Sequence, residues 1–132
     1  MTTGTAHEQD PVFDEDEALR QCLGRMDLLR KVLTACSENL PRLEEALAAE
    51  LAAEDRARLR KVAHTIKGAA GNISARRVFV SAEALEHVLQ SGDERSVREK
   101  AELLERELLV LERAITEVLG TAELSGHREP GI

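Results

Sequence analysis

The sequence predicts an all-α fold, an antiparallel four-helix bundle with an additional short N-terminal helix, and three observations lead to this prediction. Aromatic residues make up only 2% of the 132 residues, while Ala, Leu, Glu and Arg are abundant, a composition that favours helices over strands. Apolar residues recur at steps of three and four, the period of an amphipathic helix. Capping residues or Gly separate one such segment from the next.

The chain length suits one domain, predicted to cover residues 13–120. Residues 1–12 and 121–132 are polar and lack periodicity, so both are expected to be flexible tails. No apolar run approaches the ~20 residues of a membrane span, and the first ten residues do not resemble a secretory signal. The two cysteines, Cys22 and Cys36, fall on apolar stripes and indicate reduced core residues. A cytoplasmic protein without membrane contact is therefore expected.

The charge of the chain argues against one class of partner. The formal net charge is −7, from 18 Lys and Arg against 25 Asp and Glu, which disfavours nucleic acid as a partner. The charge is also uneven. The segment 56–82 holds seven basic residues and no acidic one, so it carries +7 while the rest carries −14. These basic residues are Arg56, Arg58, Arg60, Lys61, Lys67, Arg76 and Arg77.

The first two helices are predicted from their ends and their apolar stripes. Asp14 is a suitable N-cap for a helix over residues 14–23, which Gly24 would end. A long second helix begins near Asp27, and Pro41 inside it is expected to kink or locally unpair it. The apolar stripe of this helix consists of Leu29, Val32, Cys36, Leu40, Leu43 and Leu47.

Three further helices complete the predicted bundle. Asp55 and Ser74 are natural caps for the third and fourth helices, and the fourth ends at residues 91–92. The stripe of the third helix is Leu59, Val62, Ala63, Ile66, Ala70 and Ile73, and that of the fourth is Val78, Ala82, Leu85 and Leu89. The fifth helix alternates steps of four and three through Val97, Ala101, Leu104, Leu108, Leu111, Ile115 and Val118. The core of the bundle needs this apolar stripe. We therefore expect a monomer rather than a dimer that pairs through the fifth helix as a coiled coil.

One face of the third helix differs from ordinary helix surface. At 100° per residue, Gly71 lies 20° short of two turns from His64, Gly68 lies 40° to the other side, and Lys67 sits one turn along. Each glycine costs the helix about 1 kcal/mol relative to Ala, so two within four residues indicate a bare surface that something approaches closely. A histidine that holds a phosphoryl group needs a neutral ring nitrogen, open access and nearby positive charge. This face offers all three.

The motif on this face resembles the phosphorylation motif of histidine phosphotransfer (HPt) domains. It reads His64-x-x-Lys67-Gly68, continues through residues 69–73 as Ala-Ala-Gly-Asn-Ile, and is followed by Ala-Arg-Arg at 75–77. The resemblance spans roughly residues 13–119, and residues 18–27 are similar to the start of HPt modules attached to hybrid sensor kinases. Ser74 departs from the pattern, because many members have Gly there. Since Ser is a good N-cap, we expect this departure to matter little.

The resemblance implies a phosphoprotein of two-component signal transduction. His64 would accept a phosphoryl group from a receiver-domain aspartate and pass it to another receiver, with Lys67 stabilising the phosphoryl charge. Gly68 and Gly71 would give the receiver room. The implied partners are response-regulator receiver domains and a hybrid sensor histidine kinase. The family lacks kinase activity, so no enzyme, cofactor or metal site is expected, and Mg²⁺ is expected only in the receiver's acidic pocket.

An HPt-like adaptor that binds a receiver or kinase without phosphotransfer is the alternative function. The presence of both His64 and Lys67 argues against it. A metal-binding or catalytic bundle is disfavoured, because no pair of His, Cys or carboxylate residues has ligand spacing. The remaining histidines, His7, His87 and His127, are expected on solvated surface or in the tails.

Three other polar residues have positions that can bring them to the same partner. Arg60 lies one turn before His64 and either contacts the partner or is solvated helix surface. Glu86 and Gln90, on the fourth helix, can border the His64 groove.

Overall fold

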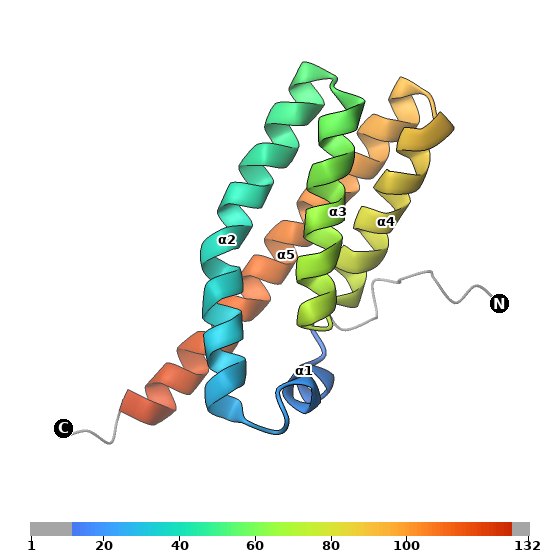
Figure 1. Cartoon of the computed structure of the whole chain (residues 1–132). Helices are drawn as coiled ribbons and strands as arrows, with labels where there is room; N and C mark the ends of the chain where they lie inside the picture. The colour runs from blue at the N-terminus through green and yellow to red at the C-terminus, as the bar shows by residue number, and fades with distance from the viewer. Residues whose placement is uncertain (1–11, 128–132) are drawn as a thin grey trace.

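Five helices form the part of the chain that the computed structural model describes, residues 12–127, with side chains described for residues 12–120. They are α1 (Glu15–Gln21), α2 (Met26–Ala53), α3 (Arg56–Asn72), α4 (Arg76–Ser91) and α5 (Glu94–His127), and Figure 1 shows them in order. Within these residues there is no strand. The predicted fold class is therefore confirmed.

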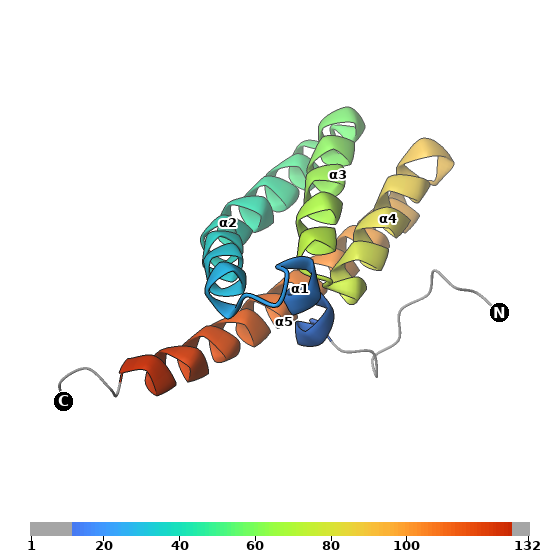
Figure 2. The ribbon, with the colours of Figure 1, turned by 60° about the horizontal axis from the view of Figure 1, so that its bottom comes forward.

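The four long helices run alternately up and down the bundle (Figure 1). Each of α2, α3 and α4 packs against the next helix in sequence, and α5 packs back against α2, which closes the bundle. The short α1 lies at the lower end, where Figure 2 shows it in front of the ends of α2 and α3. The backbone N–H of Asp14 donates to the carbonyl of Ser74 at 3.2 Å and ties the start of α1 to the α3–α4 connection.

The bundle core consists of the apolar stripes that the helical period predicts. All predicted stripe residues of α4 are buried, as are those of α5 up to Ile115. Val32, Cys36, Val62 and Val118 pack at the edge of the core and are half-buried. Leu33 was not part of the predicted stripe, yet it is fully buried. It lies four residues after Leu29, so it belongs to the same helix face.

Two of the three predicted N-caps are confirmed. Asp14 Oδ1 accepts from the N–H of Glu17 at 3.0 Å, and Asp55 Oδ1 accepts from the N–H of Arg58 at 3.1 Å. These contacts satisfy N–H groups that the first helical turn leaves without partners. The prediction that Ser74 caps α4 is wrong, because the residue before α4 is Ala75.

Ser74 instead ends α3. It has a left-handed backbone with φ of 57°, and its N–H donates to the carbonyl of Gly71 at 3.3 Å. The N–H of Ala75 donates to the carbonyl of Ala70 at 2.9 Å. This pair of bonds is the Schellman arrangement, which places a left-handed residue just after a helix. The serine hydroxyl therefore cannot serve as the N-cap of α4 in the way the sequence suggested.

Other helix boundaries differ from the sequence prediction for local reasons. α1 ends at Gln21, and both Leu23 and Gly24 have positive φ. α2 continues on both sides of Pro41, so the proline removes one N–H donor without ending the helix. α5 continues to His127 and so extends into the segment 121–132 that was expected to be a tail. One Gly costs about 1 kcal/mol in a helix that is already formed, which is too little to stop it. The predicted tail residues 1–11 and 128–132 lie outside the described part of the chain.

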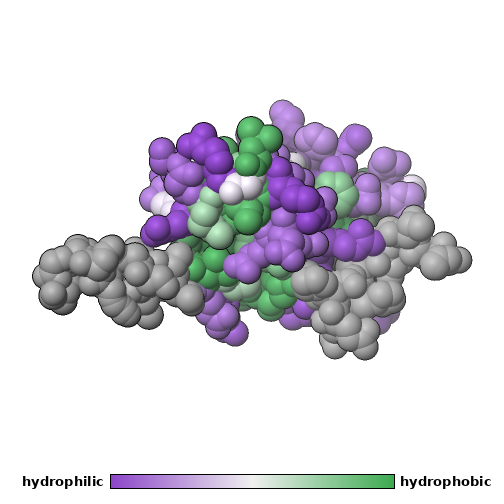
Figure 3. Space-filling view, turned by 90° about the horizontal axis from the view of Figure 1, so that it is seen from below, coloured by the Kyte–Doolittle hydropathy of each residue, from purple (hydrophilic) through white to green (hydrophobic). Residues whose placement is uncertain are grey.

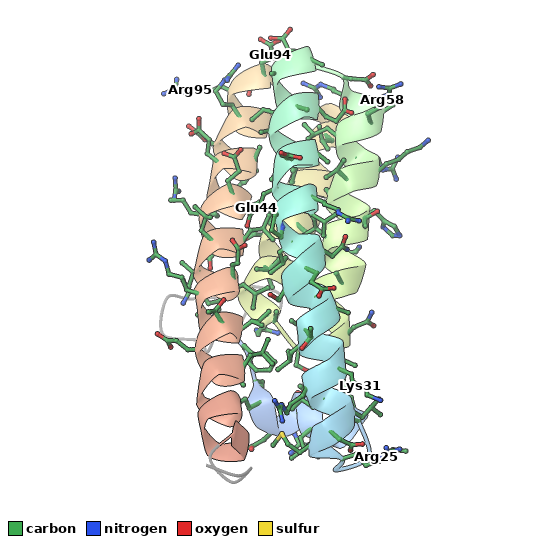
Figure 4. The ribbon with its side chains drawn as sticks, turned by 90° about the vertical axis from the view of Figure 1, so that its left-hand side faces the viewer. Arg25, Lys31, Glu44, Arg58, Glu94 and Arg95 are labelled. Atoms are coloured by element: carbon green, nitrogen blue, oxygen red, sulfur yellow. The ribbon has the colours of Figure 1, made fainter. Side chains whose placement is uncertain are left out.

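The surface is charged along the bundle and partly apolar at one end. Figure 4 shows polar side chains along the α2 and α5 side, with Glu44 between the two helices. Seen from below, apolar patches lie among polar ones (Figure 3). Leu23 of the α1–α2 connection and Met26 at the start of α2 are exposed. None of the described helices is long and apolar enough to cross a membrane.

Candidate functional site

The middle of α3 turns its predicted functional face outward. Leu59, Ala63, Ile66 and Ala70 of this helix are buried in the core. His64 lies on the open side, and its side chain is 72% exposed. The helix that buries one stripe thus presents an imidazole to solvent on the other.

One carboxylate of α4 holds both polar residues of this face. Glu86 Oε2 lies 3.0 Å from His64 Nδ1, and Glu86 Oε1 lies 2.9 Å from Lys67 Nζ. An ionised carboxylate only accepts hydrogen bonds, so the His64 ring donates its Nδ1 proton to Glu86. In the neutral ring, the second nitrogen, Nε2, then carries a lone pair and has no proton. The neutral form of the site therefore presents an unprotonated nitrogen on an exposed side chain.

The charges of Lys67 and Glu86 stabilise each other. The hydrogen bond to Glu86 raises the pKa of Lys67 above its ordinary value. Partial burial tends to raise the pKa of Glu86, whose side chain is 14% exposed, but the hydrogen bonds from Lys67 and His64 outweigh burial and leave this pKa below its ordinary value. Both groups consequently stay charged around neutral pH.

The two glycines of the face have different surroundings. A Cβ added to Gly68 would meet no atom within 4 Å, so the helix surface is bare at this point. A Cβ added to Gly71 would lie 3.6 Å from the ring of Phe79, in ordinary contact. Gly68 therefore offers open surface beside His64 and Lys67, while Gly71 lies against an aromatic ring.

The basic segment divides into structural and exposed residues. Arg56 donates to the carbonyls of Leu89 at 3.3 Å and Gly92 at 2.8 Å, at the end of α4. Arg77 forms an ion pair with Glu107 of α5 at 3.0 Å. Arg60 is exposed one turn before His64. Part of the positive charge of this segment thus forms contacts within the bundle.

The remaining candidate residues differ in their exposure. Gln90 and His87 are exposed on α4, and Cys22 is buried while Cys36 is half-buried. His7 lies outside the described residues, and the side chain of His127 is not among those described. In the described residues, no three or more His, Cys, Asp or Glu side chains gather in a way that could hold a metal ion.

Sequence reasoning left open whether Glu86 borders the site, and it missed Phe79 altogether. The ring of Phe79 lies 5.8 Å from Lys67 Nζ, measured to the ring centre. The symmetry of the α3–α4 hairpin could have placed both residues near the site. His64 and Glu86 are each eleven residues from Ala75, in the connection, and Gly71 and Phe79 are each four residues from it. Residues at equal distances from an antiparallel turn lie at the same height, since both helices rise equally per residue.

Comparisons with known proteins place the chain in a family. The family model of the Hpt domain matches residues 27–120, which cover α2 from its second residue, α3, α4, and α5 up to Gly120. The crystal structure of the HPT domain from the Hpt sensor hybrid histidine kinase from Shewanella is similar to this chain, with a TM-score of 0.76 and 21% sequence identity. The similarity covers 83% of this chain and 95% of that chain, and at this identity it shows the fold alone. None of the curated proteins compared with the chain matches it.

The bundle therefore belongs to the class of helical signal-transduction modules. The chain is a member of the Hpt domain family, whose domains carry out histidine phosphotransfer in two-component phosphorelays and interact with receiver domains and kinases. The resemblance that the His64 motif indicated is confirmed.

Proposed function

We propose that His64 accepts a phosphoryl group on Nε2 from the aspartyl phosphate of one receiver domain and passes it to the aspartate of another. The observation that carries this proposal is the contact between His64 Nδ1 and Glu86 at 3.0 Å. In the neutral ring it leaves Nε2 unprotonated, on a side chain that is 72% exposed. A nucleophilic nitrogen in an open position is what an in-line attack on a phosphoryl group requires.

The transfer proceeds by displacement at phosphorus. The Nε2 lone pair of His64 attacks the phosphorus atom, an N–P bond forms, and the P–O bond to the receiver aspartate breaks with its electron pair leaving on the carboxylate. The Nδ1 proton remains, so the phosphorylated ring is cationic and the Glu86 carboxylate stabilises it. Onward transfer reverses the step, because a carboxylate of the second receiver attacks phosphorus and the N–P electron pair returns to Nε2.

The neighbours of His64 have separate roles in this proposal. Lys67, whose side chain is 23% exposed, neutralises charge on the phosphoryl oxygens. Gly68 leaves room for the receiver, because nothing lies within 4 Å of its missing Cβ. Arg60 contacts the acidic rim of the receiver, and Gly71 supports the same face from its position against Phe79.

The domain needs no cofactor of its own in this mechanism and has no kinase activity. Transfer to and from an aspartate uses Mg²⁺ held by the acidic pocket of the receiver, so the receiver brings the metal to the complex. The partners are the receiver domains of response regulators and of a hybrid sensor histidine kinase, which the domain meets as a monomer.

A labelling experiment tests the proposal. The protein is incubated with a receiver domain phosphorylated with radioactive phosphate, and label that is acid-labile and alkali-stable identifies phosphohistidine. We expect His64→Gln to take up no label while its free energy of unfolding changes by no more than about 0.5 kcal/mol, since the side chain is exposed. His87→Gln, an exposed histidine of α4, is the matched control and should label like the wild type.

The outcomes separate the proposed function from its alternative. Label on the His64→Gln protein would show that another residue carries the phosphoryl group. A wild-type protein that binds the phosphorylated receiver but takes up no label would be an adaptor without phosphotransfer.

A further inference from the structure

Lys67 is held between two side chains of α4. Its ammonium lies 2.9 Å from Glu86 Oε1 and 5.8 Å from the centre of the Phe79 ring. Phe79 and Glu86 are seven residues apart, close to two helical turns or about 10 Å, so they point from the same side of α4. The lysine of α3 reaches into the space between them.

Phe79 is only half-buried, at the edge of the core. Its ring faces Gly71, where an added Cβ would be 3.6 Å away. It also lines a groove of about 300 Å³ that α1 borders with Glu17 and Gln21. Core packing alone does not require the Phe79 ring to lie in this half-buried position, beside a lysine and an open groove.

The two contacts of Lys67 differ in how they respond to a phosphoryl group on His64. Glu86 accepts a hydrogen bond from the ammonium, and a phosphoryl oxygen competes for that same donor. An aromatic ring attracts the ammonium through its quadrupole and leaves the N–H groups available. Once Lys67 turns toward the phosphoryl group, the ring remains as the contact that restrains its long side chain.

We propose that Phe79 is a positioning residue, whose ring keeps the Lys67 ammonium beside His64 during phosphoryl transfer. The inference rests on the proposed function of His64 and Lys67, and it adds a residue on which their transfer rate depends.

Three single variants test the role of the ring. Phe79→Leu keeps an apolar side chain and removes the ring, and single-turnover transfer from a phosphorylated receiver should slow by about 2–5-fold, the value of one exposed cation–π contact. Phe79→Tyr retains the ring and should restore the wild-type rate. Phe13→Leu is the matched control, because Phe13 also packs at the edge of the core, and its rate should be unchanged. An unchanged rate in Phe79→Leu, or a Tyr variant as slow as the Leu variant, would overturn the proposal.

A double-mutant cycle distinguishes positioning from general packing. In a Lys67→Gln background, Phe79→Leu should cause no further decrease in the transfer rate, because the ring acts through the ammonium. A full 2–5-fold decrease in that background would assign the effect of Phe79 to packing and overturn the positioning role.

A measurement without phosphotransfer keeps this inference separate from the proposed function. The Hε protons of Lys67 should show a ring-current shift in the NMR spectrum that Phe79→Leu removes and Phe79→Tyr retains. If this shift is present but the wild type takes up no label, the proposed function fails while the contact stands, and the kinetic role of Phe79 fails with the function. If the shift is absent, the positioning role is wrong even in a protein that transfers phosphate.

Discussion

The carboxylate of Glu86 performs a task that an amide in its place could not perform in full. It accepts from two donors at once, His64 Nδ1 at 3.0 Å and Lys67 Nζ at 2.9 Å. A glutamine side chain has one acceptor oxygen, so its NH₂ group would face one of the two donors. The acid therefore sets the tautomer of the histidine and retains the lysine beside it. At the scale of single residues, the site depends on this shared contact.

Gly68 allows a direct test of the bare surface. Gly68→Gln should raise the free energy of unfolding by about 0.5–1 kcal/mol, because Gln favours the helix and its Cβ meets no atom within 4 Å. The same side chain should weaken binding of a receiver domain at least roughly tenfold by occupying the docking surface. Urea unfolding and calorimetric titration measure the two effects.

Ala57→Gln is the matched control for Gly68→Gln, because Ala57 is exposed in the first turn of α3. It should leave receiver affinity unchanged. Equal affinity of the Gly68→Gln protein and the wild type would remove the steric role of this glycine.

At the scale of helices, Ser74 connects α3 and α4 at an energetic cost. Left-handed backbone costs a residue with a side chain about 1 kcal/mol relative to Gly, and Ser74 has φ of 57°. Ser74→Gly should therefore raise the free energy of unfolding by about 1 kcal/mol, while Ser74→Ala should not raise it. Urea denaturation of the two variants measures both values. If Ser74 were a helix cap, Ala would destabilise by about 1 kcal/mol and Gly by a few tenths.

The contact between α2 and α5 contains a carboxyl group that responds to pH. Burial, with the neighbouring Glu112 carboxyl, raises the pKa of Glu44 from 4.5 to about 7, and Glu44 Oε2 is buried without a hydrogen-bond partner. Between these two pKa values the folded protein binds a proton that the unfolded chain has released. The free energy of unfolding contributed by this group therefore decreases as pH rises from about 4.5 to 7.

We expect Glu44→Gln to remove this decrease. Relative to the wild type, the variant should gain about 1–3 kcal/mol of stability on going from pH 5 to pH 8, a range that allows for solvent screening. Urea unfolding at both pH values measures the difference. Glu45→Gln, an exposed neighbour on α2, is the control and should follow the wild type. Parallel curves for the Glu44→Gln protein and the wild type would show that Glu44 titrates normally.

At the scale of the whole molecule, charge is separated between the basic segment 56–82 and an acidic remainder. The segment carries +7 and the rest −14, which gives the net charge of −7. Arg56 and Arg77 form a hydrogen bond and an ion pair within the bundle, whereas Arg60 and Lys61 are exposed. An exposed basic rim steers an acidic partner mainly through the association rate.

The rate of phosphoryl transfer, measured at receiver concentrations below saturation, should accordingly decrease from low to moderate salt. The reason is that the electrostatic screening length decreases to about 10 Å or less. Arg60→Glu should slow transfer further without a change in the lifetime of the phosphohistidine. Arg95→Glu makes the same change of charge at the start of α5, at an exposed side chain, and is the matched control. Stopped-flow or quenched-flow kinetics at several salt concentrations measure these rates. Transfer that does not depend on salt would mean that apolar contacts alone carry docking.

The helical class, the order of the helices and most of the core could be predicted from the amino-acid sequence. These features depend on a period of 3.6 residues and on caps such as Asp14 and Asp55, which act within a few residues of the chain. The face with His64, Lys67 and Gly68 was also predictable, because all three residues belong to one helix. The motif they form led to the family that the comparison of residues 27–120 established.

The residues that lie across from that face follow from the packing of α4 against α3. Glu86 and Phe79 reach Lys67 because α4 packs antiparallel to α3 at one particular height, and this height depends on the turn at Ser74 and Ala75. The left-handed backbone of Ser74, which a serine rarely adopts, follows from that turn and overrides its capping preference. The pairing of Glu44 with Glu112 likewise joins two helices far apart in sequence. Local periodicity fixes which side chains share a helix face, but contacts between helices depend on the register of packing, which no single helix contains.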